Sequence, residues 1–312
     1  MFVKYSYRLT YLVTLFIAGT FVSCQNKSGA NQGNASEPAK GNVLAIASSS
    51  NSGIDEADLD KMVYVKGGTL NTKDYETGDA KQIAIKPFYI DKNLVTVADF
   101  TAFTKATGYV TEAEKFGNST VFDFKTGEWI LKDGAYYLYP FGPDQPKADP
   151  NHPVTQVSWN DAVAYAKYKK KRLPEAAEWE WAAKSGGESY STYSWGNAMQ
   201  EGTSFKANFW QGEFPSNNTK EDGFLTTSPV GYFGANPLGL YDMGGNVWQW
   251  TADKVAPTLD EAQLDTATRI VTKGGSFLCD PEVCHGFKVN GKSSSTAETG
   301  MVHTGFRCVK DI

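Results

Sequence analysis

Only a few stretches of this 312-residue chain show the regular spacing of apolar residues that marks a helix or a strand. The clearest is Thr96–Thr107, in which Val97, Phe100 and Phe103 recur at helical spacing and Gly108 follows. Apolar residues three or four positions apart share one face of a helix, and a glycine just past the last turn commonly ends it. We therefore predict an amphipathic helix over this range.

End signals predict two further helices. Ser158–Lys170 begins with a serine suited to the N-cap, has Asp161 at the capping-box position and ends in basic residues. Glu175–Lys184 follows Pro174 and is closely followed by glycine. Such signals are sparse elsewhere, so regular structure should be limited.

Short strands are predicted at Met62–Val65, Ile83–Ile90 and Gly305–Val309, and much of the remainder should be loop. The composition agrees, because 8 Trp, 16 Tyr and 18 Phe with 30 Gly indicate aromatic packing and many tight turns. Residues 61–312 are long enough for a sizeable core and contain no second linker or internal repeat. We predict a single α+β domain.

The N-terminus resembles a bacterial export signal over residues 1–23. Lys4 and Arg8 precede an apolar run that is too short to span a bilayer as a mature helix. Residues 22–24, Val-Ser-Cys, resemble a lipobox, in which Cys24 is lipidated and becomes the first residue of the mature chain. Phe21 stands where leucine is usual, so ordinary signal-peptidase cleavage nearby is the alternative.

Residues 24–60 form a predicted flexible tether, because they are rich in Ser, Gly, Asn and Ala and carry almost no large apolar side chains. A single acylated cysteine anchors a protein to a membrane without spanning it. Gln25 follows Cys24 in place of the aspartate that retains lipoproteins at the inner membrane, which favours the outer membrane. We predict an exported bacterial lipoprotein on the periplasmic face of a membrane.

The net charge of the chain indicates which classes of partner it can bind. The formal net charge is −5, and loss of the two positive charges of Lys4 and Arg8 takes it from −5 to −7. A phosphate backbone is bound by a basic face, so we expect no nucleic-acid partner.

The candidate reaction centre is the pair Cys279 and Cys284, five positions apart behind a Gly-Gly-Ser turn. This spacing matches neither a Cys-x-x-Cys redox motif nor a zinc knuckle, and no second thiol pair completes a zinc site. Two thiolates on a short segment suit Cu(I), which prefers soft ligands. A structural disulfide and two inert buried cysteines are the alternatives, and the spacing alone favours them.

Five motifs around this pair carry a family resemblance, in the order Trp210–Pro215, Glu221–Phe224, Gly239–Trp250, Gly274–Ser276 and Gly305–Cys308. Together they resemble the formylglycine-generating enzymes, also called sulfatase-modifying factors. The resemblance runs from near Met62 to the C-terminus and implies the formylglycine-generating-enzyme fold, a C-type-lectin-like α+β fold with little regular structure. The wider superfamily has members with other functions, and the two cysteines mark its catalytic branch.

The resemblance also implies a chemistry. Cys279 and Cys284 would hold one Cu(I), and the cysteine of an unfolded sulfatase segment, Cys-x-Pro-x-Arg, would join as a third thiolate. That cysteine would become formylglycine at the expense of O2 and a thiol reductant. Ser276 and Trp248 correspond to family residues that wall the oxygen pocket, with a turn residue and a core tryptophan as the alternatives.

Two calcium sites are implied in the same way. The first takes side chains and backbone oxygens from Asn208, Phe209, Asp222 and Phe224. The second takes side chains of Asp242 and Gln249 with carbonyls of Gly245 and Val247. Family members often place Asn at the Asp242 position and Glu at the Gln249 position, and loops without metal are the alternative reading of both segments.

Cys308 occupies the position of a family disulfide, but the usual partner position holds Ala166, so we predict a buried thiol outside any disulfide. The three histidines are too scattered in sequence for the iron-binding triad of the related sulfoxide synthases. We predict the copper oxidase. The alternatives are a non-catalytic lipoprotein scaffold of the same fold in a cell-envelope machine, and carbohydrate or peptide binding.

Overall fold

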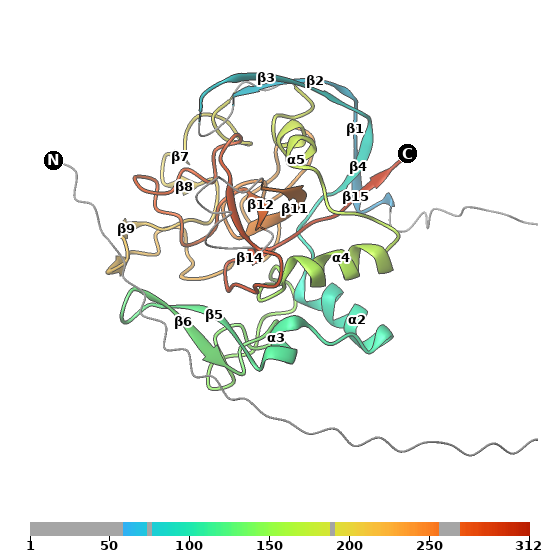
Figure 1. Ribbon diagram of the computed structural model, residues 1–312. Helices are drawn as coiled ribbons and strands as arrows, with labels where there is room; N and C mark the ends of the chain where they lie inside the picture. Colours follow the sequence, from blue (N-terminus) through green and yellow to red (C-terminus); the bar gives the residue numbers. More distant parts are fainter. Residues whose placement is uncertain (1–58, 74–76, 188–190, 256–268) are drawn as a thin grey trace, which may run out of the picture. The chain divides into compact units, whose positions relative to one another are not determined.

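The computed structural model describes residues 59–73, 77–187, 191–255 and 269–312, all within one compact unit, Gly53–Ile312. The predicted leader, the lipidation site Cys24 and nearly all of the tether lie outside the described residues. Short helices and short strands are joined by long irregular segments (Figure 1). Within the described ranges, no helix is long and apolar enough to cross a membrane.

The described helices are α2 (Val97–Thr107), α3 (Glu112–Phe116), α4 (Trp159–Tyr168) and α5 (Ala176–Ala183). The three predicted helices are therefore confirmed. The helix α2 begins one residue later than predicted and ends as predicted, and α4 and α5 are one or two residues shorter at each end. The sequence analysis missed α3, a helix of five residues.

The ends of α2 show why helix prediction worked. The Thr96 side chain accepts a hydrogen bond from the Asp99 N–H, and the Asp99 carboxylate accepts one from the Thr96 N–H. Gly108 ends the helix at a φ of 69°, a left-handed conformation that glycine adopts without strain. Val97, Phe100 and Phe103 are buried as predicted.

Among the described residues, two larger sheets and four hairpins make up the β structure. The three-stranded antiparallel sheet has the order β1 (Met62–Val65), β4 (Phe88–Asp91), β15 (Val309–Asp311). The four-stranded sheet has the order β13 (Ser293–Thr296), β12 (Arg269–Lys273), β11 (Trp248–Lys254), β14 (Thr304–Gly305). The hairpins are β2 (Gly68–Lys73) with β3 (Ala80–Ile85), β5 (Asn118–Asp123) with β6 (Glu128–Asp133), β7 (Gln200–Glu201) with β8 (Ser204–Phe205), and β9 (Gly212–Glu213) with β10 (Asn217–Asn218).

Two predicted strands are wrong in extent. Ile83–Ile90 is split between β3 and β4, which belong to different sheets, and the break contains Pro87, which has no N–H for a ladder. Gly305–Val309 is split as well. Its middle residues bond to the chain after β4 instead, where the Phe306 carbonyl accepts from the Val95 N–H at 3.0 Å.

Aromatic packing dominates the core, as predicted from composition. The ring of Phe100 lies 5.1 to 6.3 Å, centroid to centroid, from those of Phe103, Tyr137, Tyr165 and Phe306. Such ring pairs each contribute about 0.5 to 1.5 kcal/mol beyond area burial. This cluster holds α2 and α4, which lie side by side in Figure 1, against the C-terminal segment.

The four-stranded sheet brings three distant loops to one edge. Gln249 at the start of β11 pairs with Lys273 at the end of β12, and Trp248 pairs in parallel with Thr304 of β14. The segments before β11, after β12 and before β14 therefore meet. Of the predicted catalytic residues, Trp248 is the first residue of β11, and Ser276, Cys279 and Cys284 lie on the segment after β12.

Candidate active site

Cys279 and Cys284 are joined in a disulfide, with their Cα atoms 5.1 Å apart. Asp280 shapes the loop between them. Its carboxylate accepts a hydrogen bond from the Glu282 N–H at 2.7 Å, and its carbonyl accepts one from the Cys284 N–H at 2.7 Å. This turn returns the chain on itself and places the second sulfur beside the first.

The sulfur of Cys279 lies in a pocket made by the Gly-Gly-Ser turn. The Ser276 N–H donates to Cys279 Sγ at 3.3 Å, and Ser276 Oγ lies 4.0 Å from the same sulfur. A Cβ at Gly275 would lie 3.3 Å from Cys279 Sγ and 2.8 Å from the Phe287 nitrogen. Only glycine fits there, and its φ of 71° also favours glycine. The turn therefore presents a backbone donor to the sulfur.

Trp248 closes the apolar side of the pocket, in one buried cluster with Cys279, Phe287 and Tyr193. A Cβ at Gly286 would lie 2.1 Å from the Trp248 ring, so the indole packs directly on the chain after Cys284. The structure thus brings all four predicted catalytic residues together.

The two sulfurs differ in accessibility. Cys279 is 3% exposed, whereas Cys284 is partly exposed and its neighbour Val283 is 75% exposed. A partner molecule can therefore approach the pair from the side of Cys284.

Sequence reasoning overlooked His303. Its carbonyl accepts a hydrogen bond from the Trp248 N–H at 2.9 Å, and its partly exposed ring lies 4.8 Å from that of Trp129 on β6. Desolvation lowers the pKa of His303 to about 3. The parallel pairing of β11 with β14 places this histidine beside the site, and only a correct prediction of that pairing could have found it.

A cavity of about 700 Å³ adjoins the cysteine loop. Residues 280–283 form one wall, and residues 209–214 form another. Its ionisable lining side chains are all carboxylates, namely Glu213, Glu221, Asp280 and Glu282. With Phe205, Phe209, Trp210 and Phe214 also in the lining, the cavity offers apolar walls and negative charge.

The first predicted calcium set fits a cation. Asn208 is 1% exposed, and its Oδ1 is buried with no hydrogen-bond partner among the described residues. The Asp222 carboxylate accepts from the N–H groups of Phe209 and Phe224 at 3.1 and 2.9 Å, and burial raises its pKa. A buried carboxylate near an orphaned amide oxygen is a suitable donor set for a hard cation.

The second predicted calcium set, which includes Asp242 and Gln249, lies in the turn before β11 and at the start of β11. Gln249 is fully buried, and its Oε1 accepts hydrogen bonds from Trp179 Nε1 and Arg307 Nε, each at 2.8 Å. The Asp242 carboxylate accepts from the Gly231 N–H at 2.7 Å and from Asn246 Nδ2 at 3.3 Å. Gln249 Nε2 donates to the Asp242 carbonyl at 2.8 Å, so this set presents an N–H where a cation needs an oxygen and, as arranged, does not fit one.

Cys308 is buried and, within the part of the chain that the structure describes, takes part in no disulfide, as predicted. Its N–H donates to the Asp91 carboxylate at 2.9 Å. Its role is therefore in packing between β4 and the C-terminal segment.

Comparison with known proteins identifies the family of the chain. The Sulfatase-modifying factor enzyme 1-like domain matches residues 49–312, and the chain belongs to this family. The "Formylglycine-generating enzyme" of Thermomonospora curvata is 41% identical over 284 residues, covering 80% of this chain and 93% of that protein. The protein of the same name from Streptomyces coelicolor is 41% identical over 251 residues, covering 73% of this chain and 80% of that protein.

Among solved structures, PvdO from Pseudomonas aeruginosa superposes with a TM-score of 0.57 at 24% identity, covering 80% of this chain and 94% of that one. This likeness concerns the fold alone. Together with the family match, it confirms the predicted fold class.

Proposed function

We propose that this chain converts the cysteine of an unfolded sulfatase-type segment, Cys-x-Pro-x-Arg, to formylglycine. One Cu(I) held by Cys279 and Cys284 would serve the reaction, with O2 as oxidant and a thiol as reductant. One observation carries the proposal. Both cysteines meet Ser276 and Trp248 at one sheet edge, in a chain 41% identical to a named formylglycine-generating enzyme over 80% of its length.

The donor set fits the metal once the disulfide is reduced. Two thiolates on one short loop are soft ligands of the kind Cu(I) prefers, and a thiol reductant in the reaction would also open the Cys279–Cys284 bond. When bound, the copper ion would supply the one-electron chemistry that O2 requires. The protein's own part is to bind, orient and shield.

Each residue has a part in that task. The Ser276 N–H stabilises negative charge on Cys279 Sγ, because a donor to the charged form favours ionisation. Trp248, Phe287 and Tyr193 keep water from the buried side of Cys279. Cys284, which is partly exposed, lies where the substrate thiol would enter.

The overall reaction balances with two thiols. The Cβ–Sγ bond of the substrate cysteine breaks and a Cβ=O bond forms, and the sulfur leaves as hydrogen sulfide. Hydrolysis supplies the aldehyde oxygen from water, and O2 is reduced to two water molecules, so the net product is one water. O2 accepts four electrons, of which the substrate carbon gives two and two thiols, joined as a disulfide, give the other two.

The acidic cavity supports a polypeptide substrate that carries a basic residue. Carboxylates of Glu213 and Glu282 face a space that adjoins the cysteine loop. An arginine side chain could place its stem on the aromatic walls and its guanidinium among these carboxylates. The Cys-x-Pro-x-Arg segment has such a residue.

The experiment is an assay of the reduced, copper-loaded chain on a Cys-x-Pro-x-Arg peptide with O2 and thiol. Mass spectrometry should show loss of sulfur and gain of oxygen at the cysteine. Cys279→Ser and Cys284→Ser should each lower turnover by roughly a hundredfold or more, since each removes a metal ligand. Cys308→Ser is the matched control and should keep most activity, because Cys308 lies in the core away from the pair.

A copper-loaded wild type that yields no aldehyde with several such peptides would reject the enzyme proposal and favour the scaffold alternative.

We also propose that the chain is exported and tethered by a lipid on Cys24. Cys24→Ser should move the protein from the detergent phase to the aqueous phase on detergent partition. An unchanged distribution would contradict the tether.

A further inference from the structure

The guanidinium of Arg307 lies at the segment predicted to bind a second calcium. Arg307 is fully buried, and all five of its N–H groups donate hydrogen bonds. Nε donates to Gln249 Oε1, and the two Nη atoms donate to the carbonyls of Asp91, Lys92, Tyr241 and Asp242 at 2.6 to 3.2 Å. A buried guanidinium with every donor used cannot move aside without leaving N–H groups unpaired.

The orientation of the Gln249 amide follows from its neighbours. Trp179 Nε1 and Arg307 Nε are donors only, so the atom that faces both of them must be the amide oxygen. The amide nitrogen then points the other way and donates to the Asp242 carbonyl at 2.8 Å. Gln249 therefore presents an N–H, not an oxygen, to the turn.

A glutamate at this position would behave differently. One carboxylate oxygen could accept from Trp179 and Arg307, and the second would stand where the Gln249 amide nitrogen now lies. Two oxygens facing each other, one from the glutamate and one from the Asp242 carbonyl, repel unless a cation lies between them. The change from Glu to Gln thus replaces a cation ligand with a hydrogen-bond donor.

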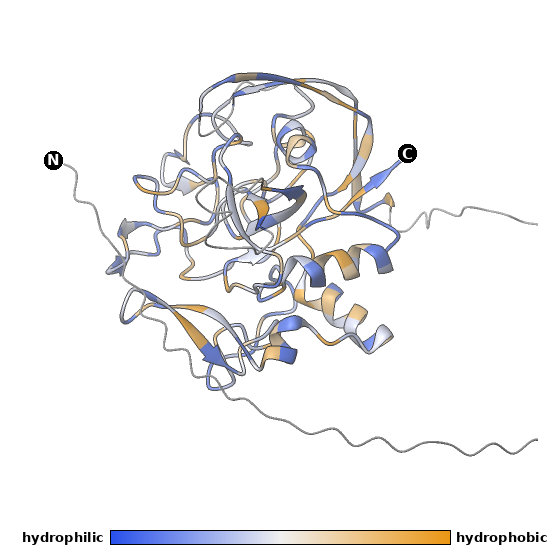
Figure 2. Ribbon diagram, in the orientation of Figure 1, coloured by the Kyte–Doolittle hydropathy of each residue, from blue (hydrophilic) through white to orange (hydrophobic). Residues whose placement is uncertain are grey.

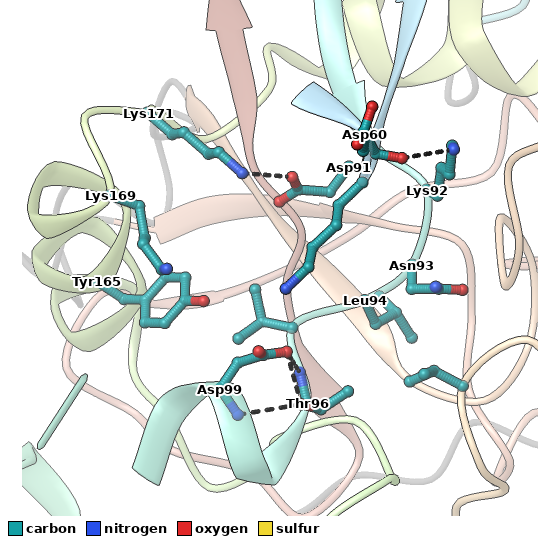
Figure 3. A pocket seen from close by; sticks show the side chains of 13 residues that line it. Asp60, Asp91, Lys92, Asn93, Leu94, Thr96, Asp99, Tyr165, Lys169 and Lys171 are labelled. Atoms are coloured by element: carbon teal, nitrogen blue, oxygen red, sulfur yellow. Dashed lines mark hydrogen bonds and ion pairs between the residues drawn. The ribbon is translucent and has the colours of Figure 1, made fainter. Parts of the chain in front are cut away.

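The charge balance points the same way. The Asp91 carboxylate is paired with Lys171 Nζ at 2.8 Å (Figure 3). That leaves Asp242 as the buried carboxylate whose charge chiefly offsets Arg307, and its two oxygens already accept hydrogen bonds. The negative charge of this set therefore lies at Asp242, whereas position 249 presents an N–H to the turn.

We infer that the Gln249 amide, held in place by Arg307 and Trp179, closes this turn in place of a second calcium ion. The chain then binds one Ca²⁺, at the Asn208 and Asp222 set, a count that rests on the proposed first site. The reverse exchange at the second set should create a site that the natural chain lacks.

The test counts calcium in purified full chain after treatment with a chelator and readdition of Ca²⁺, by isothermal titration and by atomic emission of the desalted protein. The informative variant carries Asp242→Asn and Gln249→Glu together, which restores the donor set usual in the family. Gln82→Glu, on the exposed face of β3, is the matched control for the added carboxylate.

We expect one ion in the wild type and in Gln82→Glu, none in Asp222→Asn, and two in the double variant. The gain of one ion between the wild type and the double variant tests the inference even if the first set proves empty. Two ions in the wild type would overturn it. So would a double variant that melts cooperatively, and is therefore folded, yet binds no more calcium than the wild type.

Discussion

The Ser276 N–H beside Cys279 matters most in the reduced protein, because sulfur is a weak hydrogen-bond acceptor until it is ionised. The serine hydroxyl adds a second polar group, which accepts from the Leu278 N–H at 3.3 Å and lies 4.0 Å from the sulfur. The backbone donor remains when Ser276 is replaced by any residue other than proline. The hydroxyl can therefore be tested separately from the turn.

Ser276→Ala should lower turnover and weaken Cu(I) binding by about five- to tenfold, since one hydrogen bond contributes about 1 kcal/mol. The measurements are kcat on the peptide and a Cu(I) titration against a competing chelator. Ser228→Ala, another fully buried serine but outside the site, should change neither. Equal effects of the two substitutions would assign Ser276 to folding alone.

His303 should stay neutral over the whole range in which the protein is assayed. Its pKa is lowered from 6.5 to about 3 by desolvation, so the unfolded chain binds more protons than the folded one between these values. Stability from this group is complete above about pH 6.5 and falls as pH is lowered toward 3. The His303 ring signals in an NMR titration should not move between pH 8 and pH 5, and a midpoint near 6.5 would show that water solvates this partly exposed ring.

At the scale of elements, the site depends on strand and loop pairings between segments far apart in the sequence, and no local sequence pattern predicts these pairings. The helix ends could be predicted because their signals are local, as with Thr96 and Gly108 around α2. Phe306 could not be placed correctly, since its carbonyl bonds to Val95 more than two hundred residues earlier. His303 was missed for the same reason. The cysteine pair could be predicted because both thiols lie in one short segment of the sequence.

The β5–β6 hairpin was also missed, although it carries apolar residues that Figure 2 shows in orange. Its exposed Trp129 contacts Phe122 and His303. Strand pairing between these short segments sums many weak contacts, and no single residue in them marks a function.

The acidic cavity makes a prediction about substrate choice. Glu213→Gln with Glu282→Gln should raise KM for a Cys-x-Pro-x-Arg peptide several-fold, since each partly exposed ion pair contributes about 0.2 to 1 kcal/mol, and should leave kcat nearly unchanged. With alanine replacing the peptide arginine, the same double variant should differ little from wild type. Glu128→Gln on β6 is the control. A KM change that persists with the alanine peptide would place the arginine elsewhere.

At the scale of the whole domain, backbone hydrogen bonds connect the first predicted calcium set, which contains Asn208 and Asp222, to the cysteine pair. The Trp210 N–H, next to the Asn208 and Phe209 segment, donates to the Cys279 carbonyl at 3.1 Å, and the Asn246 N–H donates to the Asn208 carbonyl at 2.8 Å. A fold with little regular structure has few ladders to fix such loops. A cation at Asn208 and Asp222 would therefore steady the reaction centre as well as the fold.

Removal of Ca²⁺ should lower both the melting temperature and the turnover. An ion bound only by the folded state at a hundred times its Kd adds about 2.7 kcal/mol, or roughly 5 to 10 °C for a domain of this size. Asp222→Asn should melt at the calcium-free temperature with or without Ca²⁺, whereas Asp133→Asn, on an exposed strand end, should keep the full difference. Differential scanning calorimetry measures this, with atomic emission to verify that the chelator has removed the ion. A melting temperature unchanged by verified removal would leave Asn208 Oδ1 without a cation partner and the loop held by hydrogen bonds alone.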